Sequence, residues 1–257
     1  MTRLVSGIVL ALAAVAAIVW LPLVALRVLA AVVAGAAAFE YAGTAGVTRD
    51  LSRALIVVMA AVTCWWFGMP AFVSAAVATA LAIAWLAVEV LLFGHDIARA
   101  AAAVIGAVYV GGPLGLLVAI HARAGWKVTL LLIATVVVSD SAQYYSGRAF
   151  GRRPLAPVVS PKKTIEGAIG GLLAAALFMA LAGSRILIGE APVPLAVLGM
   201  AMAAVGICGD LFESSLKRRA GLKDSSALIP GHGGVLDRID ALLFATPLFY
   251  LFMRDLP

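Results

Sequence analysis

The sequence predicts an all-α, polytopic transmembrane protein, and three observations support this fold class. Hydrophobic residues make up 64% of the 257 residues, and charged residues make up only 12%. The mean hydropathy is +1.09, which a water-soluble domain could not reach while covering itself with polar side chains. Apolar runs of about 20 residues recur along the chain, and each is long enough to cross a hydrocarbon layer of ~30 Å. We therefore expect lipid to be the solvent for most of the chain.

Proline, glycine and charged residues divide these runs into about nine expected transmembrane helices. The first run resembles a cleaved signal peptide, but its Ala-x-Ala triplets also occur throughout the hydrophobic part, so we expect a retained helix. Pro22 either separates two helices or kinks one longer tilted helix, and the alternative count is therefore eight. The expected helices lie near residues 4–20, 23–43, 52–67, 71–93, 98–121, 127–147, 165–184, 194–217 and 236–254.

The basic residues indicate how the chain is oriented in the membrane. Five of the 19 Lys and Arg residues follow the expected helix 127–147, and five more lie in or beside the connection between the last two expected helices. The positive-inside rule places both connections in the cytoplasm, so nine spans put the N-terminus outside and the C-terminus inside. The net charge of +6 reports these loops, and we expect no nucleic-acid partner. The ten residues are Arg148, Arg152, Arg153, Lys162, Lys163, Lys217, Arg218, Arg219, Lys223 and Arg238.

Four carboxylates within or at the ends of the expected spans attract attention, because an unpaired charge there costs a few kcal/mol or more. They are Asp140, Asp210, Glu213 and Asp237. Glu213 and Lys217 have the spacing of an ion pair at a helix end, which needs no functional explanation. Asp210 lies one turn deeper among apolar residues and is not explained in this way. Because two facing carboxylates repel each other unless a cation lies between them, we expect Asp210 and Asp237 to hold a metal, with Mg²⁺ the best match.

The connection between the last two expected helices combines basic residues with glycines. Lys217, Arg218 and Lys223 supply positive charge, and the glycines around His232 expose backbone N–H groups near the start of the next helix. That combination suits a polyphosphate. The alternative is a basic loop that only sets topology, and this alternative leaves His232 and the regular spacing of the two aspartates at 237 and 240 unexplained.

A second basic connection, residues 147–167, ends at the start of an expected helix. Lysines and hydroxyl groups beside free backbone N–H groups can hold phosphates, whereas Glu166 also suits the helix dipole without any chemical role. Each residue taken singly fits a structural role, but two such loops on one face above intramembrane carboxylates favour an enzyme. The candidate residues here are Ser160, Lys162, Lys163, Thr164 and Glu166, with Asp140 at the preceding helix end.

These motifs resemble the phosphatidate cytidylyltransferase (CDP-diacylglycerol synthase) family. The resemblance is specific over roughly residues 139–240, and Ile165 departs from it because many relatives have an aromatic residue there. It divides one integral membrane unit into N-terminal scaffold helices on the lipid side, 1–125, and C-terminal helices that carry the cytidylyltransferase site, 126–257. The matching positions in the last motif are Ser214, Lys217, Arg218, Lys223, Asp224, Pro230, His232, Gly233, Gly234, Asp237, Arg238 and Asp240.

The resemblance implies that phosphatidic acid attacks the α-phosphorus of CTP, which forms CDP-diacylglycerol and releases pyrophosphate. It implies Asp210 and Asp237 as ligands of Mg²⁺, with Mn²⁺ as an alternative and a second, monovalent cation such as K⁺ left open. Asp224 and Asp240 would orient the basic groups, and His232 would either remove a proton or organise the loop. A homodimer, membrane lipid as partner, and an inner-membrane location with a cytoplasmic active face are also implied. The implied phosphate-binding residues are Lys162, Lys163, Lys217, Arg218, Lys223 and Arg238.

Four other functional classes fit the sequence less well. A transporter would carry functional groups in both halves and near the midplane, whereas these cluster on one face of the C-terminal half. A CDP-alcohol phosphotransferase would need an Asp-Gly-x-x-Ala-Arg motif, and a soluble nucleotide-binding protein would need a phosphate-binding loop; the sequence has neither. A purely structural membrane protein would have no need for Asp210.

Overall fold

The computed structural model describes residues 2–47, 50–68, 85, 87, 90, 97–222, 225–226 and 233–254. The chain divides into two compact units, each made of two stretches of sequence. Unit 1 comprises Met1–Ala119 with Arg219–Arg238, and unit 2 comprises Ile120–Arg218 with Ile239–Pro257. The functional division expected from the sequence, at residue 125, stays a prediction.

Unit 1 is built from helices that begin and end close to the expected boundaries. They are α1 (Thr2–Trp20), α2 (Leu23–Thr44), α3 (Asp50–Phe67) and the first part of α5, which as a whole runs from Ile97 to Phe150. Pro22 lies between α1 and α2 in an extended conformation, so it separates two helices. The expected helix at 71–93 lies outside the described residues apart from three positions.

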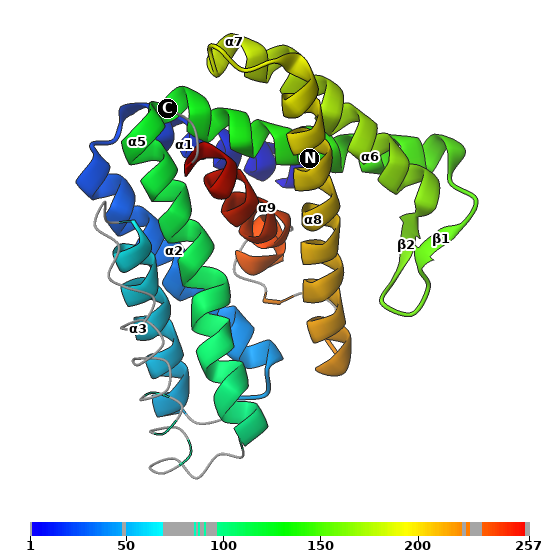
Figure 1. Ribbon diagram of the computed structural model, residues 1–257. Helices are drawn as coiled ribbons and strands as arrows, with labels where there is room; N and C mark the ends of the chain where they lie inside the picture. Colours follow the sequence, from blue (N-terminus) through cyan, green and yellow to red (C-terminus); the bar gives the residue numbers. More distant parts are fainter. Residues whose placement is uncertain are drawn as a thin grey trace. The chain divides into compact units, whose positions relative to one another are not determined.

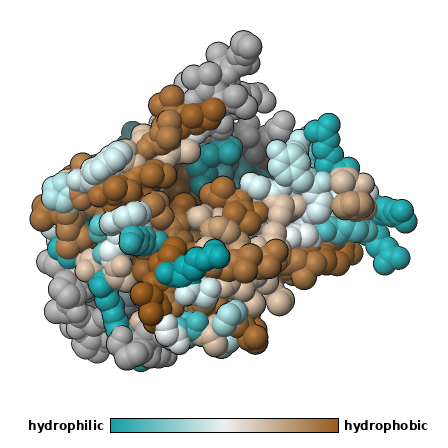
Figure 2. Space-filling model, turned by 90° about the horizontal axis from the view of Figure 1, so that it is seen from above, coloured by the Kyte–Doolittle hydropathy of each residue, from teal (hydrophilic) through white to brown (hydrophobic). Residues whose placement is uncertain are grey.

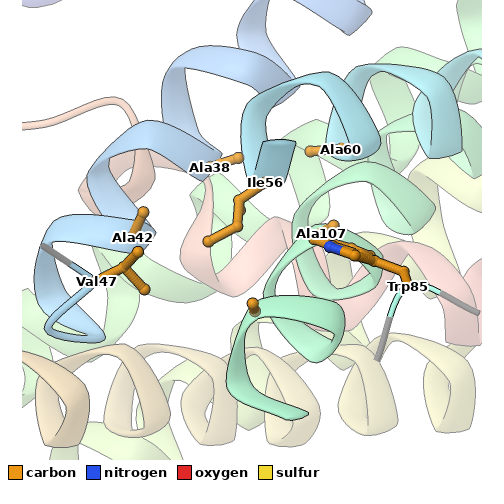
Figure 3. Packing of buried hydrophobic residues seen from close by; sticks show 8 residues of the cluster. Ala38, Ala42, Val47, Ile56, Ala60, Trp85 and Ala107 are labelled. Carbon is orange, nitrogen blue, oxygen red and sulfur yellow. The ribbon is translucent and has the colours of Figure 1, made fainter. Parts of the chain in front are cut away.

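Small residues let the helices of unit 1 pack closely. Ala38, Ile56 and Ala107 belong to one buried cluster formed by α2, α3 and α5, with Trp85 beside them (Figure 3). A Cβ atom on Gly111 of α5 would collide with the backbone carbonyl of α3, so only glycine permits this approach. Figure 1 shows α2, α3 and the first part of α5 side by side.

Unit 2 begins with the second part of α5, which is kinked at Gly125. This residue has φ of 78° and ψ of −179°, a conformation that glycine adopts without a steric penalty. The kink lies between the two helices expected at 98–121 and 127–147. The sequence therefore located the interruption: Gly125 separates two helices, and the label α5 covers both of them.

The chain after α5 forms a small hairpin where the sequence analysis expected a loop. Strand β1 (Pro154–Ala156) pairs antiparallel with β2 (Ser160–Thr164), and Pro154 lies opposite Thr164. The expected helix 165–184 is divided into α6 (Ile165–Phe178), a π-helical turn (Met179–Gly183) and α7 (Ser184–Ile186). The last two helices are α8 (Pro192–Arg219) and α9 (Leu236–Arg254).

Glycines also set the helix contacts of unit 2. A Cβ on Gly199 of α8 would meet the carbonyl oxygen of Ala175 in α6 at 2.4 Å, and one on Gly209 would meet the carbonyl of Asp240 in α9 at 2.7 Å. A Cβ on Gly171 of α6 would meet the side chain of Gln143 in α5 at 2.3 Å. Helix α6 thus contacts both α5 and α8, while α8 also contacts α9, as expected for membrane helices that associate through small residues.

Hydrophobic side chains are exposed on the outer faces of the helices in both units. Val32 is 62% exposed in unit 1, and Leu173 is 62% exposed in unit 2. Figure 2 shows such side chains over much of the visible face. In the described part of the chain, five helices are long and apolar enough to cross a membrane: Leu23–Thr44, Asp50–Phe67, Ala100–Phe150, Ile165–Ile186 and Pro192–Arg219. The all-α membrane fold is confirmed, and the count of nine stays a prediction.

Candidate active site

The candidate residues are distributed over both units, and each group is described with the contacts inside its own unit. Three of the expected residues, Lys223, Asp224 and His232, lie outside the described residues. Asp140, Asp210 and Asp240 belong to unit 2 together with the hairpin, whereas Asp237 belongs to unit 1.

The central contact of unit 2 is an ion pair between Lys163 and Asp210. Lys163 lies at the end of β2 and Asp210 in the middle of α8, and the Lys163 ammonium contacts Asp210 Oδ2 directly. Their side chains are 21% and 33% exposed, so the pair is partly shielded from solvent. The hydroxyl of Ser214 donates a hydrogen bond to Asp210 Oδ1 over 3.3 Å. Asp210 is therefore held by a cation on one oxygen and a hydroxyl on the other.

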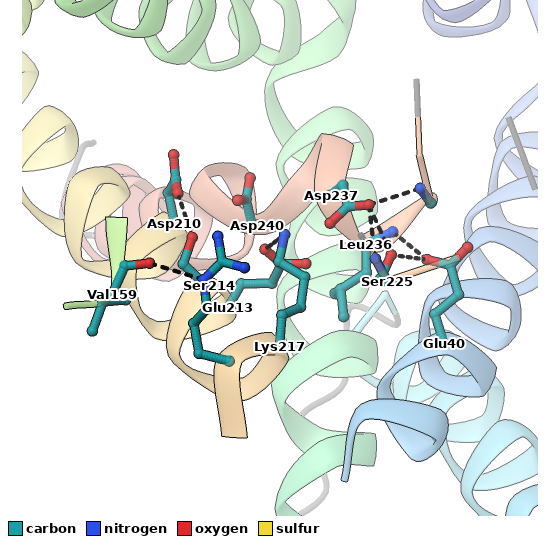
Figure 4. A network of polar contacts seen from close by, with 12 residues as sticks. Glu40, Val159, Asp210, Glu213, Ser214, Lys217, Ser225, Leu236, Asp237 and Asp240 are labelled. Carbon is teal, nitrogen blue, oxygen red and sulfur yellow. Dashed lines mark hydrogen bonds and ion pairs between the residues drawn. The ribbon is translucent and has the colours of Figure 1, made fainter. Parts of the chain in front are cut away.

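Two further aspartates lie within electrostatic reach of this pair. Asp140 of α5 interacts with both Lys163 and Asp210, and it accepts a hydrogen bond of 3.0 Å from the side chain of Gln143. Asp240 of α9 interacts with Asp210, Asp140 and Lys163. Three carboxylates from three helices thus interact with one ammonium, and Figure 4 shows Asp210 and Asp240 among them. The group attracts additional positive charge.

Glu213 and Lys217 form the ion pair that the sequence analysis considered as the simpler explanation for these residues. Their charged atoms are 2.5 Å apart within α8, and the Glu213 side chain is only 2% exposed. A buried carboxylate needs such a partner because an isolated charge is strongly penalised away from water. The expected role of Lys217 in phosphate binding stays a prediction.

The hairpin brings the two basic connections of the sequence together within unit 2. Arg218, at the end of α8, donates from Nε to the carbonyl oxygen of Val159 over 3.4 Å. Val159 lies in the turn between β1 and β2, directly before Ser160. Lys162 is exposed on β2 next to the half-buried Lys163. The sequence analysis expected two basic loops on one face. The hydrogen bond from Arg218 to Val159 connects the first of these loops with the beginning of the second.

Thr164 and Glu166 have structural roles at the start of α6. Thr164 is the N-cap residue, and its hydroxyl accepts a hydrogen bond of 3.1 Å from the backbone N–H of Gly167. Glu166 accepts hydrogen bonds from the backbone N–H groups of Arg152, at 3.0 Å, and Arg153, at 3.3 Å. Both side chains therefore fix the ends of the hairpin, and a direct role of either in substrate binding stays a prediction.

In unit 1, Asp237 of α9 accepts hydrogen bonds from residues that precede its own helix. Its Oδ2 atom accepts hydrogen bonds from the Ser225 backbone N–H, at 3.1 Å, the Ser225 hydroxyl, at 3.0 Å, and the Gly234 N–H, at 2.8 Å. The preceding Gly233 has φ of 80°, in the left-handed region that favours glycine. Arg238 is exposed on the next position of α9. The orientation of Asp237 is therefore fixed by the segment around Ser225 and by the turn into α9.

Sequence reasoning missed the buried carboxylate of this network, Glu40 of α2, and the two serines that bind it, Ser225 and Ser226. Glu40 is 3% exposed, and it accepts hydrogen bonds from two serine hydroxyls and from two backbone N–H groups at the start of α9 (Figure 4). The energetic cost that singled out Asp210 applies equally to Glu40, which follows an apolar run within the expected helix 23–43. At the N-terminal end of α9, which the sequence analysis expected to suit a polyphosphate, the N–H groups of Val235 and Leu236 donate to Glu40 and that of Gly234 donates to Asp237.

The oxygen donors suit the divalent cation expected from the sequence. Asp210 already contacts a cationic group, Lys163, and lies near two further carboxylates. Oxygen ligands of this kind fit Mg²⁺. Among the residues that the structure describes, no group of three or more His, Cys, Asp or Glu side chains has an arrangement that could hold a metal ion. Shared coordination by Asp210 and Asp237 stays a prediction.

Comparison with known proteins decides the family. The model of the cytidylyltransferase family matches residues 1–256, which is nearly the whole chain. The chain belongs to the cytidylyltransferase family. This assignment confirms the resemblance drawn from the basic and acidic motifs between residues 139 and 240.

Several curated members of the cytidylyltransferase family are similar to part of the chain. A phosphatidate cytidylyltransferase of Haemophilus influenzae is 50% identical over 129 residues, which are 48% of this chain and 45% of that protein. One of Aquifex aeolicus is 43% identical over 124 residues, 48% of this chain and 46% of the relative. One of Pseudomonas aeruginosa is 44% identical over 147 residues, 53% and 54% of the two chains. The chain spans about half the length of the curated relatives it matches.

Proposed function

We propose that this chain is a phosphatidate cytidylyltransferase, which converts CTP and phosphatidic acid into CDP-diacylglycerol and pyrophosphate. The observation that carries the proposal is the contact of Lys163 with Asp210 beside Asp140 and Asp240, in a chain of the cytidylyltransferase family. A cluster that pairs fixed positive charge with carboxylates suits the neutralisation and alignment of phosphate groups. The names of the curated relatives support the same reaction.

The proposed reaction requires positioning more than covalent catalysis. An oxygen of the phosphatidate phosphate forms a bond to the α-phosphorus of CTP, and the bond from that phosphorus to the bridging oxygen breaks, so pyrophosphate leaves with that oxygen. A phosphate monoester is largely ionised near neutral pH, so a strong general base is not required. The protein must hold crowded negative charges in line. The proposed phosphate-binding residues are Lys162, Lys163, Lys217, Arg218, Lys223 and Arg238.

We assign Asp210 and Asp237 as the residues that would hold the divalent cation, with Mg²⁺ the expected metal. Bound there, the cation would supply charge neutralisation at the substrate phosphates. Mn²⁺ is the alternative, and a monovalent ion such as K⁺ would be an additional cation. Asp240 and Asp224 would orient neighbouring basic groups. Two features of Asp210 support this assignment: its carboxylate oxygens are ligands that suit Mg²⁺, and one of them already contacts a positive charge, the Lys163 ammonium.

The proposed location is the bacterial inner membrane, with the active face in the cytoplasm. Several apolar helices make the chain a membrane protein. Five basic residues in each of two connections support cytoplasmic placement of those connections. Membrane lipid supplies phosphatidic acid, and we propose a homodimer on the basis of the family resemblance alone. No nucleic-acid partner is proposed.

The test is CTP-dependent release of pyrophosphate by the purified chain in detergent, with phosphatidic acid and Mg²⁺. The variants are Asp210→Asn and Asp237→Asn, and Glu190→Gln serves as a carboxylate control in the connection before α8. We expect release that requires the lipid and falls by at least about a hundredfold in both aspartate variants, as for loss of a group that stabilises transition-state charge. Pyrophosphate measurement and lipid chromatography together show both products.

Different failures would contradict different parts of the proposal. A folded wild-type chain that is inactive with CTP, other nucleotides and each divalent cation would refute the enzyme assignment. Activity that survives both aspartate substitutions would leave the reaction in place and refute the assigned ligands. Loss in Asp210→Asn alone would remove Asp237 from the cation site.

A further inference from the structure

Glu40 is a buried charged residue in an otherwise apolar part of unit 1. Its side chain belongs to α2, whose neighbouring positions Ala37, Ala38 and Ala42 are fully buried. Burying a carboxylate is costly unless hydrogen bonds satisfy it. Glu40 is 3% exposed, and four hydrogen bonds to its two oxygens provide that compensation. The four donors are therefore specific partners that the Glu40 carboxylate fixes in place.

The partners of Glu40 lie on both sides of the segment that precedes α9. Oε1 accepts from the Ser226 hydroxyl at 2.6 Å and from the Val235 N–H at 3.0 Å. Oε2 accepts from the Ser225 hydroxyl at 3.0 Å and from the Leu236 N–H at 2.8 Å. One carboxylate therefore connects residues 225–226 with residues 235–236, which are about ten positions apart in the sequence. Figure 4 shows this arrangement.

Asp237 shares this network with Glu40. The Ser225 hydroxyl lies within 3.0 Å of Glu40 Oε2 and of Asp237 Oδ2, so its single proton is shared between the two carboxylates. The Gly234 N–H donates to Asp237, and the next two N–H groups donate to Glu40. A Cβ on Gly234 would collide with both the Ser225 hydroxyl and the Glu40 carboxylate. The packing leaves Asp237 with one orientation.

We propose that Glu40 is a positioning residue for the reaction. It binds residues 225–226 and 235–236 to α2, and through Ser225 and the start of α9 it fixes the orientation of Asp237. This role extends the site to an N-terminal helix that the sequence assigned to scaffold alone. The inference rests on the proposed function, because it presumes that Asp237 takes part in the reaction.

The carboxylate is the group that this role needs. Glutamate offers two acceptor oxygens to four donors, whereas glutamine offers one oxygen and turns an NH₂ group toward two of those donors. Aspartate retains both oxygens but is one methylene shorter, so it reaches the donors only after a backbone shift. Ser226→Ala removes a single donor and leaves the other three bonds. Graded effects are therefore expected, strongest for Glu40→Gln, weaker for Glu40→Asp and weakest for Ser226→Ala.

The experiment combines steady-state kinetics with amide hydrogen exchange of the full chain in detergent. The variants are Glu40→Gln, Glu40→Asp and Ser226→Ala. Ser52→Ala is the matched control because Ser52 is a buried hydroxyl of unit 1 whose oxygen has no hydrogen-bond partner among the residues that the structure describes. Mass spectrometry follows exchange in the peptide that contains residues 233–238, with peptides from α3 and α6 as references. Kinetics separate kcat from KM for CTP and for phosphatidic acid.

For Glu40→Gln we expect kcat to fall about tenfold or more, because misplacing a reacting group by about 1 Å costs rate even when the fold is kept. Exchange at residues 233–238 should rise about tenfold, while the α3 and α6 peptides exchange as in the wild type. Glu40→Asp should recover part of kcat, and Ser52→Ala should match the wild type in both measurements. A purely structural role would instead raise exchange in all three peptides.

The outcomes separate this inference from the function on which it rests. An active wild type with unchanged kcat in Glu40→Gln would overturn the positioning role and leave the function standing. A rise in exchange throughout α3 and α6, or local exchange without loss of kcat, would overturn it as well. An inactive wild type would refute the proposed function and the positioning role with it. If Glu40→Gln does not fold, Ser226→Ala tests the positioning role. We then expect a smaller rise in exchange at residues 233–238 together with a smaller fall in kcat, and an unchanged kcat would overturn the role.

Discussion

Replacement of Lys163 by methionine removes the lysine that forms an ion pair with Asp210. The methionine keeps a similar length and loses the charge. Asp210 then remains beside Asp140 and Asp240, so three carboxylates lose the ammonium that interacts with all of them. We expect Lys163→Met to lower both stability and activity. The two losses have different causes, and a second substitution distinguishes them.

The stability effect follows from the geometry of the pair. Two unit charges about 4 Å apart interact by about 4 kcal/mol at an effective dielectric constant of ~20. The Lys163 and Asp210 side chains are 21% and 33% exposed, so solvent screening lowers this value. We expect a loss of about 1–2 kcal/mol, between the values for exposed and fully buried pairs. For a chain of this size, that corresponds to a fall in Tm of roughly 2–8 °C.

Thermal unfolding in detergent, followed by tryptophan fluorescence, measures this change for the single and double variants. Lys163→Met combined with Asp210→Asn removes the uncompensated carboxylate at the same time as the ammonium. The double variant should therefore lose less stability than the two single variants added together, with a coupling of about 1 kcal/mol. Activity should stay low in the double variant. Lys162→Met, an exposed neighbour on β2, is the control for stability alone and should change it by less than about 0.5 kcal/mol.

Equal Tm values for Lys163→Met and Lys162→Met would refute this reasoning, because the ion pair would then contribute nothing measurable. Strict additivity in the double variant would refute it as well. In either case Lys163 would not stabilise the carboxylate cluster, and its role would be limited to substrate.

Two further substitutions test local features of unit 2. Thr164→Ala removes the N-cap of α6 and leaves the Gly167 N–H without its acceptor, so stability should fall by about 1 kcal/mol, whereas Thr164→Ser should restore it; equal Tm values for the two would contradict the cap. Gly199→Ala forces a methyl group against the Ala175 carbonyl between α8 and α6 and should cost about 1–3 kcal/mol. Gly43→Ala, where a Cβ has nothing within 4 Å, is the matched control, and an equal effect of both glycine substitutions on Tm would exclude close packing as the cause.

The sequence by itself determined the fold class and most helix boundaries. Hydrophobicity and length decide whether a segment can cross lipid, and both are local properties that can be read from consecutive residues. The helix expected at 236–254 has the same bounds in the structure, and the interruption expected before residue 127 is the kink at Gly125. The cost of an intramembrane charge likewise singled out Asp140, Asp210 and Asp237 without any knowledge of their neighbours.

Only the tertiary structure decided which of these charged groups meet. Lys163 and Asp210 are 47 residues apart, and Glu40 bonds to residues up to 196 positions away. No local pattern encodes such pairings, because they depend on how the helices pack. The β1–β2 hairpin was missed for a related reason: its strands have three and five residues, too short for a strand pattern to stand out in a basic connection. The sequence therefore identified the charged groups that would be unfavourable in lipid without a partner. The packing of the helices, which glycine contacts bring close together, determined which partner each group has.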